Sequence, residues 1–169
     1  MKKSVLIILS SDNFNDAEFS SIKNAFENAG VKIFIGSDSN SVCKGENRLR
    51  VQPDVKFFNV NPANFDAVVI IGGSGIINYW KNKRLHEIVR DFYSAGKPTA
   101  AICAAPVVFS EAGILDGKKG VCYPKNKKEF TRRSVEYVDF PVVREGSVIT
   151  ARDFNAADEL ALTILQMIS

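Results

Sequence analysis

Residues 5–9, Val-Leu-Ile-Ile-Leu, form a continuous apolar run of strand length, and the polar residues 10–15 follow it directly. A short uninterrupted apolar run is typical of a strand buried on both faces, and the polar residues supply caps for a helix. Apolar residues then recur at helical spacing up to Gly30, which is suited to end a helix. Residues 31–35 read as the next strand. The chain therefore opens with a parallel strand, helix, strand unit.

The same alternation continues toward the C-terminus. Residues 67–71 form another apolar run, which leads through the glycine turn 72–75 to a helix predicted over residues 82–95. Residues 99–102 form a short strand that passes through Cys103 into a further helix. Strands at 135–138, 142–144 and 148–150 are predicted to precede a closing amphipathic helix over residues 157–168. The pattern predicts an α/β fold with a mostly parallel sheet and helices on both faces.

Length and composition indicate a single globular domain over residues 1–169. The chain is 46% hydrophobic and 24% charged, which is ordinary for a globular protein and excludes a disordered or collagenous one. Its apolar runs are far shorter than the ~20 residues that a membrane-spanning helix needs. The opening Met-Lys-Lys precedes only a short apolar run, which favours a strand over a signal peptide. We therefore expect a cytoplasmic protein with no membrane partner.

Charge and cysteine content argue against several other classes of protein. Three cysteines and one histidine lack the spacing of a zinc site, so no metal, cofactor or structural disulfide is expected. Residues 118–133 hold seven basic side chains and one acidic one, which we interpret as a solvated loop and helix face. No nucleic-acid-binding motif accompanies them. Residues 37–62 are polar, with strand-like pieces at 49–51 and 56–58, and no catalytic residue is assigned there.

Cys103 has the surroundings of a nucleophile. Ala101 and Ala105 stand two residues before and two after it, at the positions that must be small in a nucleophile elbow. A position at the start of a helix is expected to lower the pKa of the thiol below its free value of ~8.5. The alternative is a buried, inert cysteine, which is the interpretation we give to Cys43 and Cys122 because they lack such neighbours.

Two further segments are predicted to meet Cys103 at the ends of the parallel strands. The glycine turn lacks the sequence of a phosphate-binding loop, so we expect the amide of Gly73 to join that of Ala104 in an oxyanion site; the alternative is a tight turn. Glu18, in the first turn of a helix, is expected to face the same crevice; the alternative is simple complementarity to the helix dipole. His86 is interpreted as structural or exposed.

Four segments together resemble the ThiJ/PfpI superfamily, which includes a deglycase branch and the PfpI proteases. They are residues 12–18 (Asp-Asn-Phe-Asn-Asp-Ala-Glu), 70–73 (Ile-Ile-Gly-Gly), 100–106 (Ala-Ala-Ile-Cys-Ala-Ala-Pro) and 149–152 (Ile-Thr-Ala-Arg). The resemblance implies a flavodoxin-like, class I glutamine amidotransferase-like sandwich and a homodimer. It also implies that Cys103 is a reactive thiol, that Glu18 hydrogen-bonds it, and that the amides of Gly73 and Ala104 line the oxyanion site.

The sequence departs from this superfamily where its members carry histidine. Ala104 stands where the PfpI proteases have a histidine after the cysteine, and Tyr123, before Pro124, stands where the deglycase branch has one. Neither residue can move a proton near neutral pH, so a peptidase mechanism lacks its general base.

Three functions are compatible with these residues. The first is a glyoxalase- or deglycase-like enzyme, in which Cys103 adds to a small reactive carbonyl compound and Glu18 moves the proton. The second is an oxidation-sensing stress protein, in which an oxidant converts Cys103 to a sulfinate. The third, disfavoured, is a PfpI-like cysteine peptidase or amidase. We expect ready oxidation of Cys103, slow glyoxalase turnover and no peptidase activity.

Overall fold

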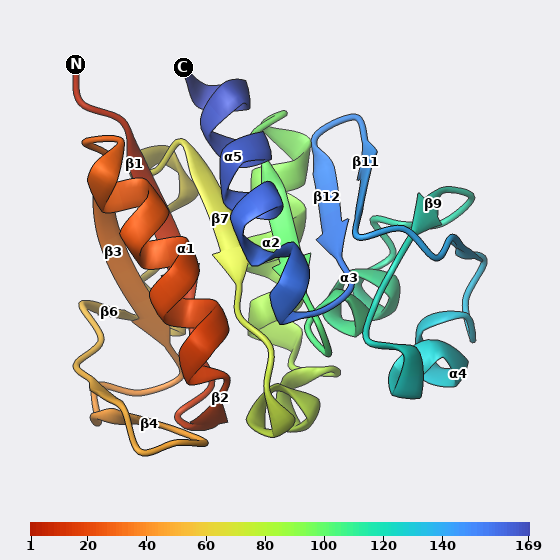
Figure 1. The fold of residues 1–169 in the computed structure, drawn as a ribbon, viewed down its shortest axis with the longest axis horizontal. Coiled ribbons are helices and arrows are strands. Elements are labelled where there is room, and N and C mark those ends of the chain that lie inside the picture. Colours follow the sequence, from red (N-terminus) through yellow and green to blue (C-terminus); the bar gives the residue numbers. More distant parts are fainter.

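The computed structural model describes residues 1–169 and is built on a seven-stranded sheet (Figure 1). Its strands are β1 (Ser4–Ile8), β3 (Lys32–Ser37), β6 (Val55–Lys56), β7 (Ala67–Ile70), β8 (Thr99–Ile102), β11 (Val142–Glu145) and β12 (Val148–Ala151). They lie in the order β11-β12-β8-β7-β1-β3-β6, and only the pair β11–β12 is antiparallel. The predicted α/β fold with a mostly parallel sheet is confirmed.

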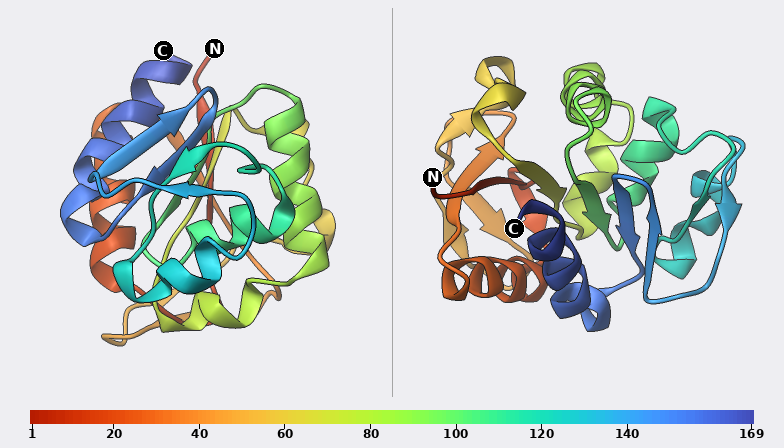
Figure 2. Two further views of the ribbon diagram at one scale, coloured as in Figure 1. Left: turned by 90° about the vertical axis from the view of Figure 1, so that its right-hand side faces the viewer. Right: turned by 90° about the horizontal axis from the view of Figure 1, so that it is seen from above.

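Helices cover both faces of this sheet. In Figure 2, α1 (Asp16–Asn28) and α5 (Ala157–Ile168) lie on one face, and α2 (Lys83–Ser94) and α3 (Pro106–Ala112) lie on the other. Because successive side chains of a strand point to opposite faces, Leu6 packs in the core beneath α2 and α3, whereas Val5 and Ile7 pack beneath α1 and α5. Burial on both faces explains why this strand is apolar from Val5 to Ile8.

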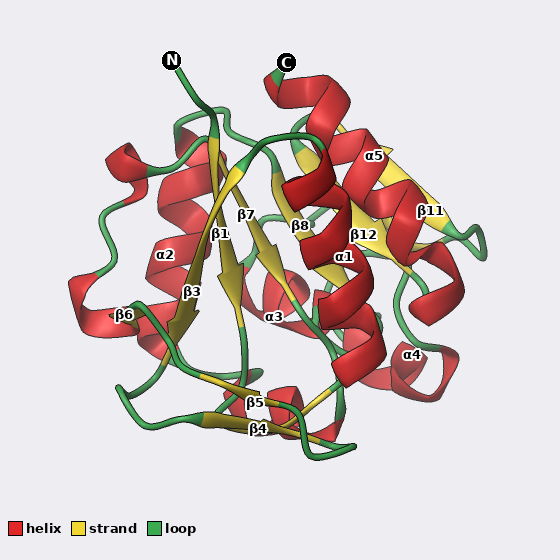
Figure 3. Cartoon of the chain, turned by 60° about the vertical axis from the view of Figure 1, so that its left-hand side comes forward, coloured by secondary structure: helices red, strands yellow, loops and turns green.

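Smaller elements surround the sheet. The strands β2 (Asp12–Phe14), β4 (Cys43–Gly45) and β5 (Arg50–Val51) form a separate small sheet near the carboxyl ends of the main strands (Figure 3). The others are β9 (Lys119–Gly120), β10 (Glu136–Tyr137), α4 (Lys127–Phe130) and the 3-10 helices η1 (Phe57–Asn59), η2 (Pro62–Asn64), η3 (Ser74–Tyr79), η4 (Pro124–Asn126) and η5 (Phe154–Ala156). None of the helices is long and apolar enough to cross a membrane.

Two predicted strands are only partly correct. Residues 56–58 were expected to be extended, but the strand ends at Lys56 and residues Phe57–Asn59 form a 3-10 helix. Phe57 is buried and Phe58 is 80% exposed, and a 3-10 turn produces this alternation as readily as a strand does. The strand expected over 135–138 is limited to Glu136–Tyr137, which pairs with β9 outside the main sheet.

The connectivity of the sheet brings three strand ends together. From β1 the chain passes through α1 to β3 on one side, and later returns to place β7 on the other side of β1. This reversal is the kind of switch point at which α/β sheets bind ligands, beyond the carboxyl ends of the strands. The ends of β1, β7 and β8 are neighbours there, and they lead to α1, the glycine turn and Cys103.

Candidate active site

Cys103 lies on a strained turn between β8 and α3. Its φ is +66°, in the left-handed region that side chains other than glycine rarely adopt, as an elbow requires. Such a conformation typically costs ~1–3 kcal/mol and persists only when its surroundings hold it. Here the Cys103 amide donates to the carbonyl of Ala151 at 2.9 Å, and the Cys103 carbonyl accepts from the amide of Tyr123 at 2.7 Å. The predicted elbow geometry is confirmed.

The packing around Ala101 and Ala105 explains why both residues are small. Ala101 and Ala105 are fully buried, so each lies in a close-packed core where a larger side chain would have to displace its neighbours. The carbonyl of Ala104 accepts a hydrogen bond from the indole Nε1 of Trp80 at 2.8 Å. The turn is therefore fixed from the core side as well as by β12.

Cys103 and Glu18 meet at Gly72. A Cβ atom on Gly72 would lie 2.7 Å from the Cβ of Cys103 and 2.8 Å from the Oε1 of Glu18. The Gly72 amide donates to the same Oε1 at 3.0 Å. The α1 N-cap also positions Glu18, because the side chain of Asn15 accepts from the Glu18 amide at 2.9 Å. The two residues that were predicted to share a crevice do so.

Gly72 is needed for space. We expect Gly72→Ala to lower the free energy of unfolding by ~1–3 kcal/mol, because the added methyl group would overlap two side chains and the carbonyl of Ile102 at 2.8 Å. Urea denaturation measures the change. Gly36→Ala is the matched control, since its closest neighbour would be the flexible end of Leu6 at 3.2 Å. Equal losses for the two variants would contradict close packing at the Cys103–Glu18 contact.

Glu18 is fully buried, and this changes its acidity. Burial raises its pKa to about 7, and the hydrogen bond from Gly72 and the neighbouring Cys103 thiol offset this only in part. The carboxylates of Glu46 and Asp153 raise the pKa further. The second carboxyl oxygen, Oε2, is buried without a hydrogen bond of ordinary geometry. A proton on Glu18 therefore relieves an uncompensated buried charge near neutral pH.

The expected low pKa of Cys103 is wrong. Burial raises the pKa of the thiol above its ordinary value, and the adjacent Glu18 carboxylate raises it further. The helix that was expected to lower it is weak: α3 is only seven residues long, begins three residues beyond Cys103 and has no side-chain N-cap. The sulfur is thus held as a thiol, and the two acidic groups titrate as a pair.

Two backbone amides, those of Gly73 and Ala104, act on the acidity of Cys103. The N–H groups of Ala104 and Gly73 hydrogen-bond Cys103 and lower the pKa of its thiol, although less than burial raises it. Gly73 has φ +109° and ψ 168°, a conformation essentially restricted to glycine, and a Cβ there would lie 2.5 Å from the carbonyl oxygen of Asn13. Only glycine therefore allows this amide to turn toward the sulfur.

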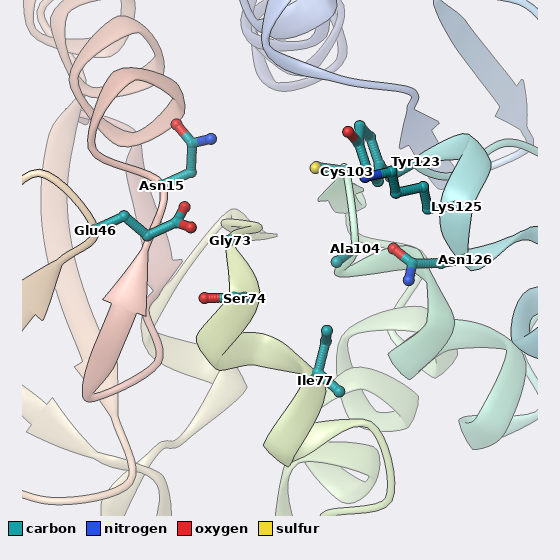
Figure 4. Close-up of a pocket in the computed structure, with 10 residues that line it drawn as sticks. All are labelled: Asn15, Glu46, Gly73, Ser74, Ile77, Cys103, Ala104, Tyr123, Lys125 and Asn126. Atoms are coloured by element: carbon teal, nitrogen blue, oxygen red, sulfur yellow. The ribbon is translucent and has the colours of Figure 1, made fainter.

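A pocket of about 330 Å³ opens beside Cys103 (Figure 4). Its lining consists of Asn15, Glu46, Gly73, Ser74, Ile77, Cys103, Ala104, Tyr123, Lys125 and Asn126. Glu46 belongs to the polar stretch 37–62, to which the sequence assigned no catalytic residue, and Lys125 belongs to the basic segment 118–133. Neither residue belongs to a catalytic sequence motif, because loops that are distant along the chain bring them to the pocket.

No imidazole reaches the pocket. Ala104 and Tyr123 line it at the two positions where other members of the superfamily carry a histidine. The one histidine, His86, lies on α2, and its Nε2 is 2.7 Å from the carbonyl oxygen of Trp80. The structural role expected for His86 is consistent with this contact.

Cys103 should be the most readily alkylated thiol. It is partly exposed in the pocket, whereas Cys43 and Cys122 are fully buried. Burial raises the pKa of all three thiols, so access to the reagent distinguishes Cys103. We therefore expect iodoacetamide to label Cys103 first in the folded protein, as judged by peptide mass mapping over pH 5 to 8. In urea all three thiols should react alike. Faster labelling of Cys43 or Cys122 in the folded state would contradict the assignment.

The fold and the site define an α/β protein with a cysteine on a nucleophile elbow. Residues 3–167 match the model of the DJ-1/PfpI family, and the chain belongs to this family, as the resemblance implied. It is 35% identical over 167 residues to an uncharacterized protein of Methanocaldococcus jannaschii, covering 97% of this chain and 82% of that protein. It is 32% identical over 147 residues to the deglycase PfpI of Pyrococcus furiosus, covering 87% and 89%.

Solved structures agree with this assignment. The crystal structure of a ThiJ/PfpI domain protein from Brachyspira murdochii superposes with a TM-score of 0.95 at 26% identity, and the match covers 100% of both chains. The crystal structure of Drosophila melanogaster DJ-1beta gives a TM-score of 0.89 at 31% identity, with 99% of this chain and 91% of that one covered.

Proposed function

We propose that the protein acts on small reactive carbonyl compounds through Cys103 and Glu18, as a glyoxalase- or deglycase-like enzyme. The observation that carries this proposal is the contact of the two side chains at Gly72, beneath an open pocket, with the pKa of Glu18 at about 7. A general base is most effective when its pKa lies near the working pH. Relatives named deglycases, including that of Pyrococcus furiosus, support the proposal.

The chemistry begins with addition of the thiol to the carbonyl group. The Glu18 carboxylate takes the proton from the sulfur as the sulfur bonds to the carbonyl carbon, and the carbonyl electron pair moves to the oxygen. In this proposal the amides of Gly73 and Ala104, which lower the pKa of the thiol, also stabilise the negative charge that develops on the carbonyl oxygen. Protonated Glu18 then returns its proton to the oxygen, which completes a hemithioacetal. With methylglyoxal, a shift of hydrogen from the former aldehyde carbon to the neighbouring ketone carbon gives a lactoyl thioester, and water cleaves it to lactate and the free Cys103 thiol. Glu18 thus takes the role for which the sequence offered no histidine.

Methylglyoxal tests the proposal. The protein should consume it catalytically. Intact mass should show an adduct of one methylglyoxal molecule, and peptide mass mapping should assign this adduct to Cys103. Casein should remain uncleaved, because a peptidase would need a proton carrier for the leaving amine and no imidazole lines the pocket. Casein cleavage that depends on Cys103 would favour the peptidase alternative, and failure to consume methylglyoxal or form the adduct would refute carbonyl chemistry.

Oxidation sensing is the second candidate function, and the donors around the sulfur favour it. The amides of Gly73 and Ala104 and a protonated Glu18 could each hydrogen-bond an oxygen of a Cys103 sulfinate. The raised pKa of the thiol opposes it, because peroxide reacts with the thiolate. Mild peroxide followed by intact mass decides the matter: a gain of two oxygen atoms at Cys103, faster than in the unfolded chain, supports sensing, and a slower gain opposes it.

A further inference from the structure

Glu46 lies on a loop that is fastened to the start of α1. The loop connects β4 and β5, and the Glu46 amide donates to the carbonyl of Phe14 at 2.9 Å. The carboxylate of Asp16 accepts from the amides of Asn47 and Leu49 at 3.0 and 2.8 Å. These bonds fix the backbone on both sides of Glu46, and its exposed side chain lines the pocket.

Lys125 is held on the opposite side of the pocket (Figure 4). It lies in η4, whose preceding residue, Tyr123, donates its amide to the carbonyl of Cys103 at 2.7 Å. The Asn126 amide in turn donates to the carbonyl of Tyr123 at 2.8 Å. The short helix that carries Lys125 is therefore tied directly to the elbow, so the backbones that carry both charges are held on opposite sides of the sulfur.

Both charges are unpaired. Neither Glu46 nor Lys125 is part of any ion pair or side-chain hydrogen bond in the structure, although five ion pairs form elsewhere. Lys44, Arg48 and Arg50 surround a second hollow that Glu46 also borders, and none of them pairs with it. Opposite charges at the two sides of a concave site create a field across it, which orients a dipolar ligand.

We infer that Glu46 and Lys125 are specificity-determining residues that select a zwitterionic, amino-acid-like carbonyl substrate, with its ammonium group toward Glu46 and its carboxylate toward Lys125. This inference rests on the proposed function, in which Cys103 is the reacting group. The pocket of about 330 Å³ has room for such a compound, whereas methylglyoxal would fill only a small part of it and would meet neither charge.

Four disulfides of similar size test the charge preference independently of carbonyl chemistry: cystine is zwitterionic, cystamine cationic, 3,3′-dithiodipropionate anionic and bis(2-hydroxyethyl) disulfide neutral. In each reaction the Cys103 sulfur bonds to one sulfur of the probe, the probe disulfide breaks, and the leaving half departs as a thiol with the proton from Cys103. Intact mass follows the mixed disulfide. Each rate is divided by the rate at which 2-mercaptoethanol reacts with the same probe, which removes the intrinsic reactivity of the probe. This ratio is then divided by the same ratio for the neutral probe.

The expected order places cystine first. Glu46→Gln should lower the relative rates of cystine and cystamine about three- to fivefold and spare dithiodipropionate, the size expected for one solvent-accessible charge pair. Lys125→Gln should lower those of cystine and dithiodipropionate and spare cystamine. Glu27→Gln and Lys2→Gln make the same charge changes far from the pocket, at the end of α1 and at the N-terminus, and should alter none of the ratios.

Two results would overturn the inference: cystine reacting no faster than the neutral probe, or the distant variants changing the ratios as much as the pocket variants do. Division by the neutral probe removes any general effect of Glu46 on the Glu18–Cys103 pair. The proposed function fails separately, if the neutral disulfide does not react at Cys103 or methylglyoxal is not consumed. Charge selectivity can therefore be lost while the carbonyl chemistry remains.

Discussion

Replacing Cys103 by serine is expected to abolish methylglyoxal consumption, with a fall in rate of about 10⁴-fold or more, the scale seen when a covalent nucleophile is removed. The reason is chemical, since the two side chains have nearly the same size. A serine hydroxyl is a far weaker acid than a thiol, and a carboxylate with a pKa of about 7 cannot remove its proton effectively. Stopped assays of the remaining methylglyoxal measure the loss.

The other two cysteines provide the controls. Cys43→Ala and Cys122→Ala should keep the rate within a few-fold of the unaltered protein, because both thiols are buried in the core and neither lines the pocket. Circular dichroism must show that all three variants are folded. A Cys103→Ser variant that retains a tenth of the original rate would place the chemistry on another residue.

The parts of the fold that the sequence predicted correctly depend on local pattern. The apolar run at residues 5–9 is buried on both faces of the sheet, so its composition directly reports its place in the structure. The elbow at Cys103 is equally local, because the sharp strand-to-helix turn requires small residues two before and two after Cys103, whose φ is positive. Glu18 lies in the first turn of α1, the helix that directly follows β1 and β2 in the chain.

The pKa of Cys103 could not be predicted in this way. A helix start two or three residues ahead is visible in the sequence, but the depth of burial and the nearby Glu18 carboxylate come from segments brought together by the sheet. These two effects outweigh the amides that stabilise the thiolate. Desolvation is a property of the packed site, and residue spacing carries little information about it.

Glu46 was missed for a similar reason. Its loop reaches the pocket because β4 pairs with β2, in a small sheet of short strands with no hydrophobic periodicity. Asp16 then fastens the loop to α1, and Gly45 is required because a Cβ there would lie 2.1 Å from the carboxylate oxygen Oδ1 of Asp16. In retrospect Gly45 was the available signal, since it marks a close approach of the backbone to another segment.

Replacing Glu18 by glutamine is expected to lower methylglyoxal turnover about 10²–10⁴-fold, the usual contribution of a general base. Glutamine keeps an acceptor for the Gly72 amide but cannot take the thiol proton. In the unaltered protein turnover should rise as the pH passes through about 7, because the carboxylate form of Glu18 is the base. The variant should lack this rise. A retained inflection near pH 7 would assign it to another group.

The same substitution should stabilise the protein at alkaline pH. The pKa of Glu18 is raised from 4.5 to about 7 in the folded state, so between these values the folded protein binds the proton that the unfolded chain has lost. Stability from this group is complete below pH 4.5 and is lost as the pH rises through 7, a penalty of about 3 kcal/mol at pH 8. Glutamine carries no charge to bury and avoids this penalty. From pH 5 to pH 8, the unfolding free energy of Glu18→Gln should therefore rise by about 2–3 kcal/mol relative to that of the unaltered protein.

Urea titrations at both pH values measure this change, with the exposed Glu27→Gln as a control that should show no such shift. A shift of zero for Glu18→Gln would mean that its carboxyl group is not destabilised by burial, and the case for Glu18 as a base matched to neutral pH would fail with it.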